Sequence, residues 1–176
     1  MINKRGQIWI ETAIYTLIGL TIIAIVLSIA TPQIEKSRER AIIQQTKTAL
    51  DDLNVEIQKV QQNAGTVKIV YFKLTKGKLD INSNEDKITY TMEDTKLEFS
   101  EEGVEIKEGE VTFKTEKNGK RFNVIMELYY DNINITHNGN DELRTLQASG
   151  SAHKLQLENV GDNEIGGKTH VDLKVG

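Results

Sequence analysis

The sequence predicts an α+β protein in which a long N-terminal membrane helix continues as an amphipathic helix that packs on an antiparallel, β-rich head. Two observations carry this prediction. The first is an uncharged run from Thr12 to Ile34 in a chain whose residues are 27% charged. The second is a change of the hydrophobic period from helical to alternating after Gly65. The 176 residues suffice for one small domain and one additional element.

The composition excludes several functional classes. The net charge is only −4, and Lys and Glu alternate along the chain without a basic patch, so nothing indicates a nucleic-acid partner. The chain has no Cys, which excludes disulfides, thiolate catalysis and Cys-based zinc sites. A soluble cytoplasmic enzyme would have no reason to carry the apolar run at the start of this otherwise polar chain.

The apolar run has the length of a membrane-spanning helix. About 23 residues at ~1.5 Å each extend roughly 34 Å, enough for a hydrocarbon core of ~30 Å. Lys4 and Arg5 precede the run, so the positive-inside rule places the N-terminus in the cytoplasm and the residues after Pro32 outside.

Three interpretations of this segment compete. A secretory signal cut after Ala30 would have an apolar region of about 7–15 residues, shorter than the run found here. A plain membrane anchor explains the length and the flanking charge but leaves Glu11 and the Gly6-Gln7 pair to chance. A leader cut before the run would keep the helix whole. The acid is informative because a charge at the centre of a membrane helix costs about 2.5–3.5 kcal/mol.

The residues Lys4-Arg5-Gly6-Gln7, followed by Glu11, resemble the class III signal peptide of archaeal type IV pilin-like proteins. A dedicated prepilin-type peptidase cuts that signal between its Gly and Gln, so the resemblance implies removal of residues 1–6. The family often shows Gln-x-Ser-x-Glu-x-x-x-Leu. Here Trp9 stands in place of the Ser and Tyr15 in place of the Leu, while the cleavage site and the acid are kept.

The resemblance also implies a function. The new amine of Gln7 and the Glu11 carboxylate of a neighbouring subunit would neutralise each other in an apolar environment, where an unpaired charge is costly. The expected protein is a structural subunit of a cell-surface filament. Its partners would be membrane lipid before assembly, then other copies of itself or related pilins, with the peptidase, an assembly ATPase and its membrane platform. No cofactor and no nucleic acid are expected.

Pro32, the one proline, stands where the apolar run meets charged residues, and it predicts a bend or a break in the helix. The next segment carries an apolar stripe at spacings of three and four, typical of a helix that covers a sheet. Its residues are Ile43, Thr46, Leu50, Leu53, Ile57 and Val60. Asn63-Ala64-Gly65 is a stop signal. The expected organisation is a leader at 1–6, an assembly helix at 7–31, an amphipathic helix at 32–65 and an extracellular head at 66–176.

The head is expected to be a sandwich or meander of short strands. Asn118-Gly119 is the strongest hairpin signal among its turns, with positive φ expected at both residues. The expected strands are Val67–Leu74, Lys78–Ile81, Lys87–Met92, Lys96–Phe99, Val104–Lys107, Glu110–Thr115, Arg121–Tyr130, Ile133–Thr136, Ala152–Leu157 and His170–Val175.

The head shows no catalytic signature, and we expect no enzymatic activity. His137, His153 and His170 lack metal-ligand spacing, and the oxygen-rich stretch from Asp131 to Glu142 does not meet the calcium-loop pattern. No metal is expected. Asn134-Ile135-Thr136 is a glycosylation sequon on the side of the membrane where glycosylation is possible.

Two alternatives to the filament subunit remain. The same helix is suited to anchoring a monomeric surface protein with a binding head. It is also suited to a minor or stator-like component of a pilus or archaellum machine. Glu11→Ala separates these alternatives, because we expect it to block filament incorporation while leaving the subunit in the membrane.

Overall fold

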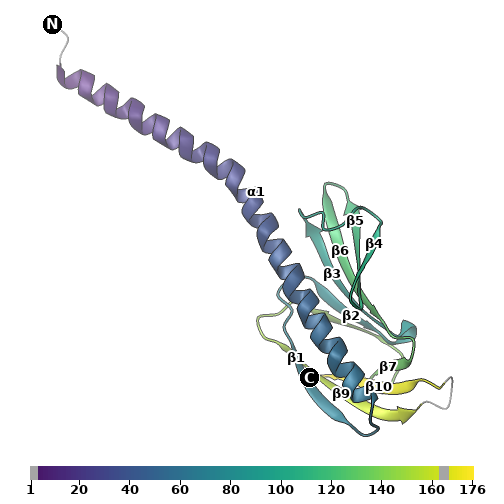
Figure 1. Ribbon diagram of the computed structural model, residues 1–176. Helices are drawn as coiled ribbons and strands as arrows, with labels where there is room; N and C mark the ends of the chain where they lie inside the picture. Colours follow the sequence, from purple (N-terminus) through teal and green to yellow (C-terminus); the bar gives the residue numbers. More distant parts are fainter. Residues whose placement is uncertain (1–3, 163–166) are drawn as a thin grey trace. The chain divides into compact units, whose positions relative to one another are not determined.

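The computed structural model describes residues 4–162 and 167–176 (Figure 1). The chain divides into two compact units, the first ending at Arg38 and the second running from Glu39 to Gly176. The leader residues Met1 to Asn3 lie outside the described residues. Helix α1, Lys4–Gln61, contributes to both units.

Helix α1 is continuous through Pro32. A proline removes one backbone hydrogen bond, here to the carbonyl of Ser28. The helical hydrogen bonds on either side of it are enough to keep the helix continuous. The predicted alternative of a break is therefore wrong, while the bend remains a prediction.

The second unit contains two sheets. The four-stranded sheet has the order β1-β9-β10-β7, and the six-stranded sheet has the order β4-β5-β6-β3-β2-β8. The strands of the described residues are β1 Val67–Phe72, β2 Lys78–Asn82, β3 Lys87–Thr95, β4 Glu105–Glu108, β5 Val111–Asn118, β6 Arg121–Tyr129, β7 Ile133–His137, β8 Leu143–Gln147, β9 His153–Asp162 and β10 Thr169–Val175. A short 3-10 helix, η1 Ser83–Glu85, joins β2 to β3.

Pairing between neighbouring strands is antiparallel except for β7 and β10, which pair in parallel from Ile133↔Thr169 to His137↔Leu173. The expected α+β layout of a long apolar helix followed by mainly antiparallel sheets is thus present. A purely antiparallel sandwich or meander is absent, because β7 and β10 are parallel neighbours. The chain between these two strands is a crossover that contains β8 and β9.

One predicted strand is absent and one strand was missed. Residues 96–99 alternate polar and apolar, but their backbone groups bond to side chains: Lys96 N–H donates to Glu39 and Leu97 N–H donates to Thr95 Oγ1. Strand β8 gave no signal because it is an edge strand in which only Leu146 is buried.

The hairpin signal was correct in place but wrong by one residue in register. Asn118 pairs with Arg121, so the two loop residues are Gly119 and Lys120. Only Gly119 has positive φ, at 63°. A positive φ at the first loop residue alone is the sign pattern of a type II′ turn, in which Gly is preferred at that position.

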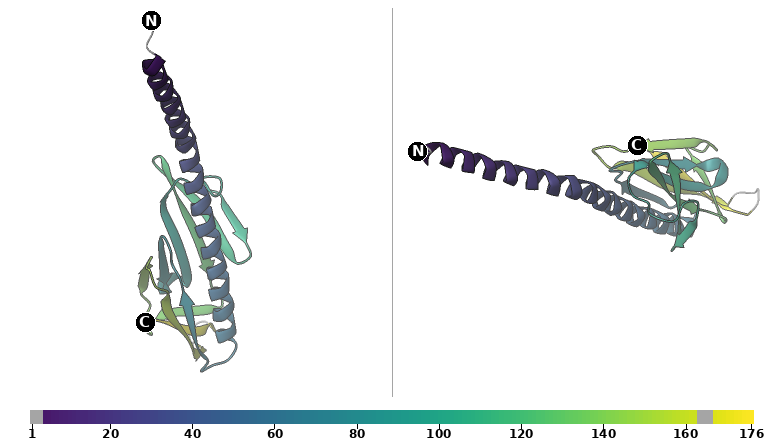
Figure 2. Two further views of the ribbon diagram at one scale, coloured as in Figure 1. Left: turned by 90° about the vertical axis from the view of Figure 1, so that its left-hand side faces the viewer. Right: turned by 90° about the horizontal axis from the view of Figure 1, so that it is seen from above.

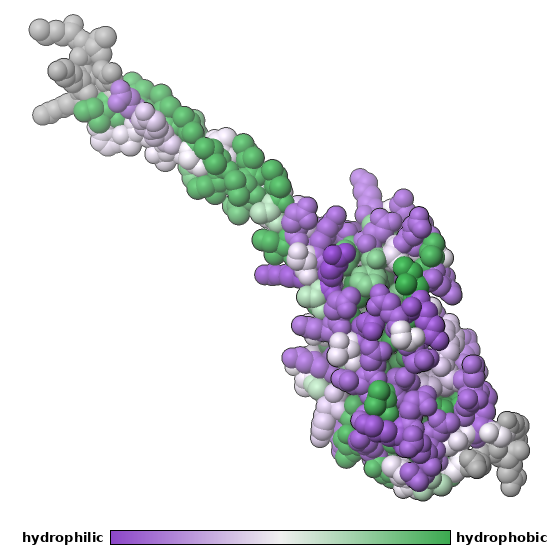
Figure 3. Space-filling model, in the orientation of Figure 1, coloured by the Kyte–Doolittle hydropathy of each residue, from purple (hydrophilic) through white to green (hydrophobic). Residues whose placement is uncertain are grey.

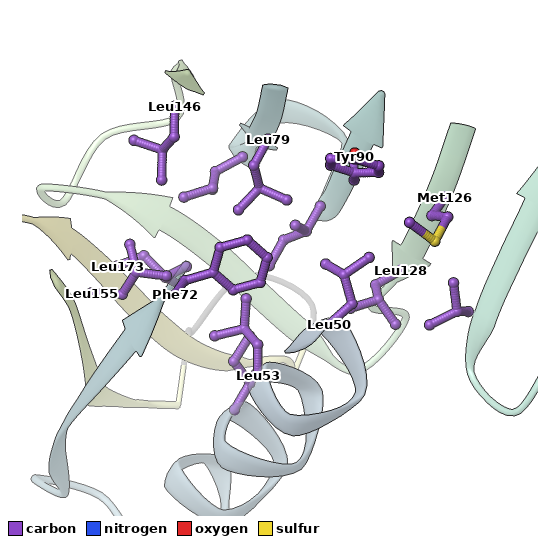
Figure 4. Packing of buried hydrophobic residues seen from close by; sticks show 14 of the residues in the cluster. Leu50, Leu53, Phe72, Leu79, Tyr90, Met126, Leu128, Leu146, Leu155 and Leu173 are labelled. Carbon is purple, nitrogen blue, oxygen red and sulfur yellow. The ribbon is translucent and has the colours of Figure 1, made fainter. Parts of the chain in front are cut away.

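The core of the second unit joins the helix to both sheets. All six residues of the apolar stripe on α1 are buried. Figure 4 shows part of this cluster, with Leu50 and Leu53 of the helix near Phe72 of β1. Residues of both sheets belong to it, among them Leu155, Leu173, Leu79, Tyr90, Met126, Leu128 and Leu146. The final turns of α1 lie along the strands in both views of Figure 2. This segment of the helix is therefore part of the head's core.

Asn159 of β9 caps the C-terminal end of α1. Its side-chain amide donates to the carbonyl oxygens of Val60 and Gln61 at 2.9 Å each, and its backbone bonds Gly65 and Thr66. Gly65, the last residue of the predicted stop signal, has a positive φ of 78°. The helix end is thus satisfied by the sheet on which it packs.

Candidate assembly and processing site

The N-terminal part of α1 presents an apolar surface on all sides. Within the described residues, α1 is the one helix that is long and apolar enough to cross a membrane, and none of its most apolar stretch is buried. Figure 3 shows this part of the helix covered by apolar side chains, whereas the visible face of the second unit is mainly polar. An apolar surface of this extent requires lipid or another apolar surface against it. By its length and composition, this helix could therefore span a membrane.

The Ser and Thr hydroxyl groups along this segment are satisfied within the helix. Thr12, Thr16, Thr21 and Thr31 each donate to the carbonyl oxygen four residues before, at 2.7–2.9 Å, and Ser28 donates to Ile25 O at 2.8 Å. Hydrogen bonds of this kind let Ser and Thr enter an apolar environment without an unsatisfied donor. The hydroxyl side chains therefore do not oppose burial of the segment.

Glu11 is the one charged residue between Gln7 and Glu35. It lies on α1 with an exposed side chain, between the exposed Ile10 and Thr12. Since Gln7 and Glu11 are four residues apart, they share one face of the helix. The sequence-predicted assembly residues are thus on one face of one helix.

The predicted cleavage-site residues Lys4, Arg5, Gly6 and Gln7 form the first turn of α1. The side chains of these four residues lie outside the described ones. Pro32, the predicted bend, lies 21 positions after Glu11, inside the same helix. The predicted site residues of the N-terminal segment therefore all lie on one continuous helix, with Pro32 well separated from the others along it.

A polar anchor at Glu39 fixes α1 to the head where the second unit begins. The side chain of Glu39 is charged, yet it is only 9% exposed. Its Oε1 accepts from Lys76 Nζ at 2.8 Å, and its Oε2 accepts from Thr95 Oγ1 at 2.6 Å and Lys96 N–H at 2.9 Å. Position 39 is four residues before Ile43 on the buried stripe, and this spacing was the signal that could have revealed it.

Electrostatics at this anchor favour the charged carboxylate. Burial raises the pKa of Glu39, but the hydrogen bonds from Lys76, Thr95 and the Lys96 N–H together outweigh it, so the pKa lies below its ordinary value. The ionised form of Glu39 is therefore the one that stabilises the attachment of the helix.

The sequon residue Asn134 lies in β7 and is half-buried, and Thr136 is buried. Thr136 Oγ1 donates to Asp172 Oδ1 at 2.8 Å and lies 2.8 Å from His170 Nε2, across the parallel strand pair. Because this hydroxyl is held in a strand by two partners, modification of Asn134 would have to precede folding of β7. Glycosylation of Asn134 remains a prediction.

Each of the three histidines has its own hydrogen-bond partner. His137 Nδ1 lies 2.6 Å from Glu142 Oε1, His153 Nε2 lies 2.8 Å from Gln147 O, and His170 bonds Thr136. No group of three His, Asp or Glu side chains in the described ranges has the geometry of a metal site. These hydrogen bonds connect strands and turns, so a structural role accounts for the three histidines.

Comparison of the chain with known protein families, with curated proteins and with solved structures found no match.

Proposed function

We propose that this protein is a structural subunit of a type IV pilus-like surface filament, processed between Gly6 and Gln7 and assembled through the N-terminal part of α1. The observation that carries the proposal is an unburied apolar helical segment, between Gln7 and Glu35, whose single charged residue stands four positions after Gln7. The fold adds support, because the same helix continues into the core of the head and is capped there by Asn159.

Assembly would require no catalysis. The subunit would first sit in the membrane with its head outside. The helices of many copies would then exchange lipid contacts for contacts with one another, which keeps their apolar surface away from water. Cleavage removes Lys4 and Arg5, the cations that hold the N-terminus in the cytoplasm, and leaves the chain free to move out of the membrane.

Glu11 would determine the axial stagger of the helices. Its carboxylate would pair with the Gln7 amine of a neighbouring copy inside the apolar bundle. Such a pair is favourable only when both charges are together, because either one alone would be an uncompensated charge in a medium of low dielectric constant. A bend at Pro32 would adapt the helix to oblique packing around the filament axis.

The test compares Glu11→Ala with Thr16→Ala, a control one and a half turns away whose hydroxyl bonds only its own helix. We expect Glu11→Ala to leave the subunit in the membrane at normal amounts and to reduce filament incorporation at least tenfold, while Thr16→Ala assembles normally. Electron microscopy and fractionation of sheared cells measure both quantities. Normal filaments from Glu11→Ala would contradict the proposal and favour a monomeric membrane-anchored surface protein.

A further inference from the structure

Two edge strands of the head share an unusual combination of features. Strand β1 is hydrogen-bonded only to β9 and β4 only to β5, so each leaves one backbone edge unpaired within the described strands. Each edge also exposes apolar side chains. Exposed apolar residues alternate along β1 at Val67, Ile69 and Tyr71. On the other edge, Ile106 lies in β4 and Val104 directly precedes the strand. Tyr71 is 69% exposed, which is a large exposure for an aromatic side chain.

The two edges carry opposite charge. The segment from Thr66 to Lys76 contains three Lys and no acid, whereas the segment from Glu101 to Glu110 contains five Glu and one Lys. Lys68 and Lys76 are neutralised by Glu56 and Glu39. The charge that remains at the β1 edge is that of Lys73, joined by Lys154, which lies directly opposite Tyr71 on β9.

The acidic edge keeps most of its charge. Lys107 pairs with Glu110 at 3.4 Å. Across the described residues, Glu101, Glu102 and Glu108 make no ion pair, and Lys73 and Lys154 make none either. Charged residues on an edge strand ordinarily discourage pairing with another edge. Here the sign of the charge discourages β1 from pairing with β1 and β4 with β4, but favours pairing of β1 with β4.

We propose that the β1 edge of one copy docks on the β4 edge of the next copy by strand addition. The contact joins two different surfaces, so every copy keeps one free edge of each kind and the contact propagates along an open array rather than closing as a dimer. Backbone hydrogen bonds supply part of the affinity and the apolar residues supply part of the buried surface. The inference rests on the proposed filament function, for which it supplies the contact between neighbouring heads.

The test uses the absence of Cys from the chain. The full-length double variant Ile69→Cys/Ile106→Cys is produced in cells that make the filament and is treated with a short bis-maleimide. Strands that pair lie about 4.8 Å apart, so cysteines at the centres of the two strands fall within reach. We expect a ladder of covalent dimers, trimers and higher multimers. The matched control Ile69→Cys/Leu143→Cys places the second thiol on β8, the opposite edge of the same sheet as β4, and should give no ladder.

Charge reversal supplies the second measurement. Lys73→Glu/Lys154→Glu, added to the cysteine pair, should lower the yield of multimers at least fivefold. Adding Glu101→Lys and Glu108→Lys to that variant should restore the yield, which a folding defect would not allow.

Each outcome decides between the proposals. A ladder in filaments that depends on both cysteines supports the contact. Filaments without a ladder overturn the β1–β4 contact and leave the proposed function standing. Dimers from Ile69→Cys alone overturn the heterologous arrangement in favour of β1 pairing with itself. Absence of both filaments and ladder overturns the contact together with the proposed function.

Discussion

The Glu39 carboxylate accepts a hydrogen bond from Lys76 Nζ at 2.8 Å, across 37 residues of sequence. This bond joins the first residue of the second unit to the loop between β1 and β2. The other carboxylate oxygen is held by Thr95 and the backbone of residue 96. A single buried acid thus attaches α1 to the β1–β2 loop and to the C-terminal end of β3.

Removal of the Glu39 carboxylate should destabilise the head. Glu39→Ala leaves the Thr95 hydroxyl and the Lys96 N–H without their acceptor, and hydrogen bonds to charged groups contribute about 1.5–3 kcal/mol. We expect the free energy of unfolding to fall by about 2–3 kcal/mol, and by about half as much for Glu39→Gln. Urea unfolding of the full chain in detergent, followed by circular dichroism, measures the loss. Glu102→Ala, an exposed acid, is the control and should change stability by less than about 0.5 kcal/mol. Equal losses in all three variants would exclude a specific anchor.

The same anchor predicts a pH dependence. The folded pKa of Glu39 is lowered from its model-peptide value of 4.5, so the unfolded chain binds the proton more readily than the folded one. The stabilisation is complete above pH 4.5 and is lost as the pH falls through the lower, folded pKa. The stability difference between wild type and Glu39→Gln should therefore shrink below this pH. Unfolding curves at a series of pH values from neutral downwards measure it, and a difference that stays constant would contradict the anchor's ionised state.

The buried stripe of α1 should be sensitive to truncation. Leu53 is fully buried, and Leu53→Ala should cost about 2–5 kcal/mol because it leaves a cavity between the helix and both sheets. Val55 lies on the same helix but is 48% exposed, so Val55→Ala should cost no more than about 0.5 kcal/mol. Thermal unfolding of the two variants under one condition makes the comparison. Similar melting temperatures would mean that the helix does not pack on the sheets in solution.

Gly77 should tolerate a side chain less well than Gly119, although both have positive φ. A Cβ at position 77 would collide with the Thr91 carbonyl oxygen and lie 3.0 Å from the Tyr90 ring, whereas one at position 119 would meet open space. Left-handed φ costs an Ala about 1–2 kcal/mol. We expect Gly119→Ala to lose about that amount and Gly77→Ala distinctly more, as measured by urea unfolding. A smaller loss at Gly77 would contradict the packing of the β1–β2 loop.

The sequence predicted the elements whose signals are local. The spacing from Ile43 to Val60 predicted the face of α1 that is buried. The stop signal Asn63-Ala64-Gly65 was placed correctly after the helix, although α1 ends at Gln61, four residues before the expected end at 65. The hairpin between β5 and β6 was predicted from its glycine, but its register was not, because Asn118 and Gly119 fit two turn types that differ by one residue.

Features that depend on distant partners could not be predicted. Residues 96–99 alternate like a strand, yet their N–H groups bond to Glu39 and Thr95, and only the tertiary structure shows this. The parallel pairing of β7 with β10 depends on a crossover that no local pattern specifies. In the candidate site the motif named Gln7, Glu11 and Pro32, while the anchor at Glu39 was hidden among similar charged residues of the helix.

The N-terminal residue of the protein isolated from its cell envelope is the most direct test of the central claim. Peptide mass spectrometry should find that the mature chain begins at Gln7, with α1 otherwise intact. The same spectrum reports the Gln7 amine, because cyclisation would lower the mass by one ammonia and remove the charge that Glu11 is proposed to pair with. A chain that begins at Met1 would contradict the claim and indicate a permanent anchor, and one that begins at Thr31 would indicate a secreted head without its assembly helix.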